Sequence, residues 1–165
     1  MRILIKQGRL IDPTQNLNQI GDLYIVHGKI VSVDNAPDGF QPDHILLAHN
    51  HFVIPGLVDL YAHLNDSYGA VQLHEAAVAA KRGFTTLFCA PDGKMIRDSI
   101  TRVEKFLESD VSYIDVLPIG ALSEHLKGNA MSDLTALHAA GCCVFSNGIY
   151  PMQDLNFIRN LYLYA

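Results

Sequence analysis

The sequence has 165 residues, of which 49% are hydrophobic and 18% are charged, and its formal net charge is −5. This composition supports a packed core and disfavours a disordered chain. The negative charge disfavours a nucleic-acid partner, which needs a basic surface. We also expect no membrane partner, because no apolar run approaches the ~20 residues that a spanning helix needs.

We expect the chain to reside in the cytoplasm. The N-terminal MRILIKQGRLID has the pattern of a charged strand, and its apolar stretch is too short for a secretory signal. The three cysteines, Cys89, Cys142 and Cys143, lie in apolar runs without the spacing of a disulfide framework or a zinc knuckle. Their pattern therefore favours core packing in a reducing compartment.

The first 54 residues predict a β region. Short runs rich in β-branched residues alternate with turn signals, and these runs are MRILIKQGRLID, GDLYIVHGKIVSV and HILLAHNHFVI. Within the second run, Lys29 follows His27-Gly28. This pattern fits a tight hairpin, because glycine accepts a positive φ without steric cost.

From residue 55 onward the pattern changes to strands that alternate with helices. Strands are expected at 57–64, 84–91, 111–120 and 142–146. Helices are expected at 70–82, at 95–109, from a cap at Ser132 or Asp133 to a stop at Gly141, and at 152–165. This order predicts parallel β/α units of an α/β fold. Four units are half of a TIM-like barrel, which needs ~250 residues. We therefore expect a piece of a longer protein, with an open four-stranded sheet as the alternative.

Six segments follow one another along the chain: IKQGRLIDP, GDLYIVHGKIVSV, IPGLVDLYAHL, GFTTLFCAPDG, DVLPIGALSEHLKG and AAGCCVFSNG. Together they resemble dihydroorotase, a member of the amidohydrolase superfamily of metal-dependent ring-opening and ring-closing hydrolases. IPGLVD alone indicates only an amidohydrolase, whereas IGALSEHLKG followed by a strand and SNG indicates dihydroorotase. The resemblance implies part of a small β-sandwich in residues 1–54 and the first half of a (β/α)8 barrel in residues 55–165. It also implies metal at the C-terminal ends of the barrel strands.

Two positions that bind metal in the resembling family are changed in this chain. After IPGLVD the family has a His-x-His pair, whose side chains share one face of a strand and can bind one zinc ion. This chain has Tyr61 and His63, and a phenol with a pKa of ~10 is a poor zinc ligand at neutral pH. Asn147 replaces a metal-binding aspartate and brings no negative charge to hold two divalent ions. His63 is therefore either half of a persisting metal site or an ordinary strand-end histidine.

Two substrate-binding positions of the family are changed as well. Asn65 replaces an arginine that binds the substrate carboxylate in a two-pronged contact, which an amide cannot supply. Asp66 beside it would repel a dicarboxylate such as carbamoyl aspartate. Asp92 replaces an asparagine and exchanges a neutral group for an anion. The family's later histidines and its catalytic aspartate would fall beyond residue 165.

These four departures predict a chain with no catalytic residues and no bound cofactor. The resembling family includes inactive chains that assemble with aspartate carbamoyltransferase, the preceding enzyme of pyrimidine synthesis. The leading hypothesis is such an assembly or support subunit, which also forms homo-oligomers because a half-barrel exposes strand edges and apolar surface. The alternative is an active zinc-dependent dihydroorotase or related cyclic amidohydrolase that interconverts carbamoyl aspartate and dihydroorotate, with His63 as a metal ligand.

Overall fold

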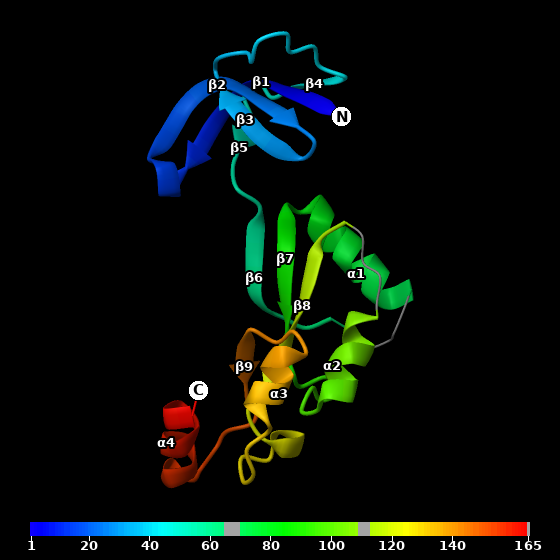
Figure 1. Ribbon diagram of the computed structural model, residues 1–165, viewed down its shortest axis with the longest axis vertical. Coiled ribbons are helices and arrows are strands. Elements are labelled where there is room, and N and C mark those ends of the chain that lie inside the picture. Colours follow the sequence, from blue (N-terminus) through cyan, green and yellow to red (C-terminus); the bar gives the residue numbers. More distant parts are fainter. Residues whose placement is uncertain (65–69, 109–112, 165) are drawn as a thin grey trace. The chain divides into compact units, whose positions relative to one another are not determined.

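The computed structural model describes residues 1–64, 70–108 and 113–164 (Figure 1). The chain divides into two compact units, Met1–Pro55 and Gly56–Ala165. The first is a mixed β sheet and the second is a parallel β/α half-barrel, so the predicted fold class is confirmed. Within the described residues, no helix has the length and apolar character to cross a membrane.

The N-terminal unit is a single five-stranded sheet. Its elements are β1 (Arg2–Asp12), the 3-10 turn η1 (Pro13–Gln15), β2 (Leu17–Val26), β3 (Lys29–Val33), β4 (His44–Leu47) and β5 (Phe52–Val53). The order is β3-β2-β1-β4, and β4 and β5 both pair with β1 in the parallel sense. The predicted hairpin joins β2 to β3, where His27 (φ 50°) and Gly28 (φ 76°) both adopt the left-handed conformation.

The C-terminal unit contains four parallel strands in chain order. These are β6 (Leu57–Ala62), β7 (Phe84–Cys89), β8 (Asp115–Ala121) and β9 (Val144–Ser146). The helices are α1 (Ala70–Lys81), α2 (Ile100–Leu107), α3 (Leu134–Ala139) and α4 (Leu155–Tyr164), with the 3-10 turn η2 (Glu124–Leu126) after β8. Because all four strands run in the same direction, their carboxyl ends lie at one edge of the sheet (Figure 1).

Two apolar clusters attach the helices to this sheet. In the first, Ala76 of α1 packs with Ala62, Leu87 and Ile114, and small alanine side chains let the helix approach the strands closely. The second is formed by residues from α2, α3, α4 and the segment before β9, and its buried members are Val103, Leu134, Leu137, Cys142 and Leu161. Burial of each large aliphatic side chain stabilises the unit by roughly 1.5–3 kcal/mol.

The predicted first residue of the helix over 95–109 is wrong. α2 begins at Ile100, after Ser99 in an extended conformation. The apolar pair Met95-Ile96 extends the helical pattern in the sequence, but this segment forms a loop around the buried side chain of Arg97. A loop lets the guanidinium reach carbonyl groups of two strands, and this tertiary requirement overrides local propensity.

The other predicted boundaries are closer to the observed ones. Asp133, and not Ser132, caps α3, because its Oδ1 accepts a hydrogen bond from the Ala136 amide at 2.9 Å. Gly141 (φ 117°) follows the helix as predicted. β9 begins only at Val144, so Cys142 and Cys143 precede the strand. Cys142 is buried, as is Cys89 in β7, whereas Cys143 is exposed, so the predicted core packing is confirmed for Cys89 and Cys142 and is wrong for Cys143.

Candidate functional site

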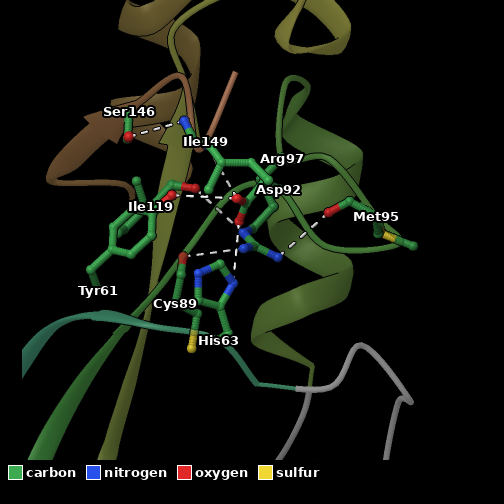
Figure 2. A network of polar contacts seen from close by, with 10 residues as sticks. Tyr61, His63, Cys89, Asp92, Met95, Arg97, Ile119, Ser146 and Ile149 are labelled. Carbon is green, nitrogen blue, oxygen red and sulfur yellow. Dashed lines mark hydrogen bonds and ion pairs between the residues drawn. The ribbon is translucent and has the colours of Figure 1, made fainter. Parts of the chain in front are cut away.

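Groups at the carboxyl ends of three strands, two side chains and one backbone amide, meet at the carboxylate of Asp92 (Figure 2). Tyr61 lies near the end of β6 and His63 directly follows that strand, whereas Asp92 follows β7 and Ile149 follows β9. We call these four residues the Asp92 cluster. The parallel strands explain how positions 31 and 57 residues apart come into contact.

The side chain of Asp92 is almost completely buried, with 2% of it exposed. Its Oδ2 accepts hydrogen bonds from the Tyr61 hydroxyl at 3.4 Å and from the Ile149 amide at 3.3 Å. Both bonds are long and therefore weak. The His63 Nδ1 lies 3.5 Å from Oδ1, and among the described residues Oδ1 has no hydrogen-bond partner. Among the described residues, hydrogen-bond donors therefore engage only Oδ2 of this carboxylate.

Tyr61 acts in this cluster as a neutral hydrogen-bond donor. Burial, and then the negative charge of Asp92, raise the pKa of its phenol above the usual value of 10.0. Its ring meets the His63 ring edge to face, with centroids 5.2 Å apart and an interplanar angle of 80°. Because a raised pKa keeps the hydroxyl protonated at neutral pH, Tyr61 engages Asp92 as a neutral donor.

A glycine allows the chain after β9 to approach Asp92. Gly148 has a φ of 66°, and a Cβ atom added to it would lie 2.8 Å from the Asp92 Cβ. The Gly148 amide also donates to the Ser146 hydroxyl at 3.1 Å, which tightens the turn. A residue with a side chain would be strained here by both conformation and contact.

Arg97 fixes the backbone that carries Asp92. Its buried guanidinium donates to the carbonyl groups of Cys89 at 3.1 Å and Ile119 at 3.3 Å, and so joins the end of β7 to β8. It also lies over the Phe106 ring, 4.7 Å from the centroid. Sequence reasoning missed this residue because its neighbours continue the pattern of a helix, and an arginine on an amphipathic helix predicts an exposed side chain.

Asn147 belongs to a different hydrogen-bond network, which fixes the loops after β8 and β9. The side chain is buried, with the residue 6% exposed. Its Oδ1 accepts from the Ser123 hydroxyl at 2.5 Å, and its Nδ2 donates to the carbonyl groups of Leu126 at 3.2 Å and Tyr150 at 2.9 Å. An amide supplies both the acceptor and the two donors that this position uses, whereas a carboxylate supplies acceptors only.

A second buried carboxylate lies on the loop before α2. Asp98 accepts through Oδ1 from the Arg102 guanidinium at 2.5 Å and through Oδ2 from the His125 amide at 2.9 Å. These bonds hold the loop at His125 and Leu126, two non-glycine residues with positive φ. In contrast to Asp92, both oxygens of Asp98 have strong donors.

The structure therefore brings together three of the five residues that the sequence singled out. Tyr61, His63 and Asp92 are in contact, and Asn147 is bonded elsewhere. Asn65 lies outside the described residues. No group of three or more His, Cys, Asp or Glu side chains in the described part of the chain is placed to hold a metal ion. The metal-binding and substrate-binding roles of these positions stay predictions.

Comparison with known proteins identifies the family. Residues 50–157 match the family model described as "Dihydro-orotase-like". A protein named "Dihydroorotase-like protein" from Pseudomonas aeruginosa PAO1 is 36% identical over 171 residues, which cover 100% of this chain and 40% of that protein. A protein named "Dihydroorotase" from Geotalea daltonii is 31% identical, with the same shares covered. This chain thus spans about 40% of the length of these relatives.

Solved structures show the same fold at low sequence identity. The L-hydantoinase (dihydropyrimidinase) from Arthrobacter aurescens superposes with a TM-score of 0.76 at 18% identity, over 97% of this chain and 37% of that one. A crystal structure of a dihydroorotase gives a TM-score of 0.57 at 20% identity, over 99% of this chain and 39% of that one. Together with the family match, these similarities establish that the chain belongs to the dihydroorotase-like family of the amidohydrolase superfamily.

Proposed function

We propose that the full-length protein is a catalytically inactive dihydroorotase-like subunit that supports the assembly of aspartate carbamoyltransferase in the cytoplasm. The observation that carries this proposal is the Asp92 cluster. A buried carboxylate stands where the family resemblance implies a neutral substrate contact. Donors of the chain itself, Tyr61 and the Ile149 amide, engage it.

The donors in this part of the chain do not fit a zinc ion. Zinc sites use three or four His, Cys or carboxylate ligands at ~2.0–2.3 Å. Here Tyr61 is a neutral phenol, and the buried amide of Asn147 is engaged by Ser123, Leu126 and Tyr150. Among the described residues of the Asp92 cluster, His63 and Asp92 remain, and two ligands are too few.

The proposed partnership rests on the family resemblance and on apolar surface. β6 and α4 expose large hydrophobic side chains, including Leu60, Tyr162 and Leu163. Exposed apolar surface of this kind favours association with further protein, whether the remainder of the same polypeptide, a second copy or a partner enzyme. We propose that the full-length protein is a homo-oligomer within the assembly.

An active zinc-dependent dihydroorotase is the second candidate. The retained His63 and the 31% identity to a relative named "Dihydroorotase" favour it. In that case ligands from the remainder of the full-length protein would complete a metal site with His63. The metal would supply a water of lowered pKa for attack on a cyclic amide.

Two measurements on the purified full-length protein separate the candidates. Elemental analysis gives zinc per chain, and an assay with dihydroorotate and added zinc gives turnover. The assembly proposal predicts neither zinc nor turnover, together with co-purification of aspartate carbamoyltransferase at a fixed ratio. Stoichiometric zinc with turnover overturns it, and so does an aspartate carbamoyltransferase that assembles equally well without this protein.

A further inference from the structure

We propose that the Asp92 cluster binds an alkylammonium ion, that is, a protonated primary amine with a short apolar chain, through Asp92 Oδ1. This inference concerns a ligand and goes beyond the proposed assembly function.

The two oxygens of the Asp92 carboxylate are unequal. Oδ2 accepts two hydrogen bonds, whereas Oδ1 has no hydrogen-bond partner among the described residues although it is buried. A buried acceptor without a donor destabilises the fold, and more so when it is charged. The nearby carboxylate of Asp98 has strong donors on both oxygens, so the deficit at Asp92 is not general to buried carboxylates of this unit.

The His63 side chain lies next to this oxygen and is free to rotate away from it. Its Nδ1 lies 3.5 Å from Oδ1, which is too far for a good hydrogen bond, and 59% of its side chain is exposed. Exposed side chains change rotamer within picoseconds to nanoseconds. Rotation of the imidazole away from Asp92 uncovers an anionic acceptor, and a cationic donor fits that acceptor best.

The adjoining groove has the lining that such a cation needs. It has a volume of about 280 Å³ and is lined in part by Tyr61 and His63. Its other charged lining residues are Asp59, Glu75 and Arg82. Asp92 does not line the groove itself, but its carboxylate contacts Tyr61 and His63, which do. Leu64, Val78 and Phe84 supply apolar surface for a short alkyl chain. An anionic ligand at Oδ1 would be repelled by the buried carboxylate itself.

The probe is butylammonium chloride, with sodium butyrate as a control of equal chain length and opposite charge. The full-length protein is labelled with ¹⁵N-isoleucine, and the Ile149 amide is followed, because it donates to the same carboxylate. Butylammonium should shift this signal with saturation, and butyrate should not. Asp92→Asn should weaken binding by about tenfold or more, because a charge-assisted hydrogen bond becomes a neutral one. Asp98→Asn is the matched control and should bind within about twofold of the parent. His63→Ala removes the cover and should bind more tightly.

Three results would overturn the inference: no saturable shift with butylammonium, an equal shift with butyrate, or binding retained in folded Asp92→Asn. The readout is independent of zinc content, turnover and co-purification. A negative result in the butylammonium titration would therefore not affect the proposed assembly function. Refutation of the assembly function would likewise leave the binding of butylammonium open to the same test.

Discussion

Asn147→Asp should destabilise the protein, although it introduces the residue that the family resemblance implies for metal binding. The substitution replaces the Nδ2 donor by an acceptor that faces the carbonyl groups of Leu126 and Tyr150. Two hydrogen bonds are lost and a charge is placed at a position that is 6% exposed. With ~1–3 kcal/mol for each buried group left unsatisfied, the expected loss in the free energy of unfolding is about 2–4 kcal/mol.

The destabilisation should depend on pH. Burial and the facing carbonyl groups raise the pKa of the new carboxyl group above its unfolded value, and the protonated acid can donate one hydrogen bond. The variant is therefore closest to the parent below the unfolded pKa, and it loses stability as the pH rises through the raised folded pKa. Urea unfolding at pH 5 and pH 8 measures this difference. Asn156→Asp, at an exposed position in the first turn of α4, is the control and should stay within about 0.5 kcal/mol of the parent. An Asn147→Asp variant as stable as this control would refute the structural role of the amide.

Three further substitutions test other parts of the site. Gly148→Ala should lower the free energy of unfolding, measured in urea, by about 1–3 kcal/mol more than Gly39→Ala does. Both glycines have similar positive φ, but only the added Cβ at 148 would meet Asp92, and equal losses would remove the close approach as the reason for glycine. Arg97→Met should lower the free energy of unfolding by about 2–4 kcal/mol, because it leaves buried carbonyl groups without donors, and a neutral effect in the same assay would contradict this role. Burial raises the pKa of the Cys142 thiol from 9.0 to about 11, so stability that is present below pH 9 should decline as the pH rises to 11. Between pH 9 and pH 11, the urea concentration at the unfolding midpoint should fall less steeply with pH in Cys142→Ala than in the parent protein. An equal dependence on pH in both proteins would show that the thiol does not contribute.

Local pattern predicted the parallel β/α units because strand and helix periods alternate clearly along residues 55–165. The predicted element boundaries were wrong where tertiary contacts determine the observed ones. The segment before Ile100 has helical propensity, but the buried guanidinium of Arg97 needs carbonyl acceptors on two strands, and a loop provides that reach. No local signal encodes such a contact.

The sequence identified most residues of the candidate site, but it did not predict all of their contacts. Tyr61, His63 and Asp92 lie at or just after the carboxyl ends of strands that the sequence places side by side, so their contact follows from the parallel topology. The separate network of Asn147 was not predictable, because Ser123 and Leu126 come from a loop whose path depends on two left-handed residues, His125 and Leu126. The role of Arg97 and the unequal oxygens of Asp92 likewise required the folded structure.

The proposed loss of catalytic chemistry in the full-length dihydroorotase-like protein is tested most directly by zinc content and turnover measured on the same sample. The full-length protein is purified without chelators, its zinc is measured per chain, and dihydroorotate hydrolysis is followed with and without added zinc. The proposal predicts substoichiometric zinc and no turnover above the uncatalysed rate. One zinc or more per chain, with turnover that a chelator abolishes and zinc restores, would contradict it.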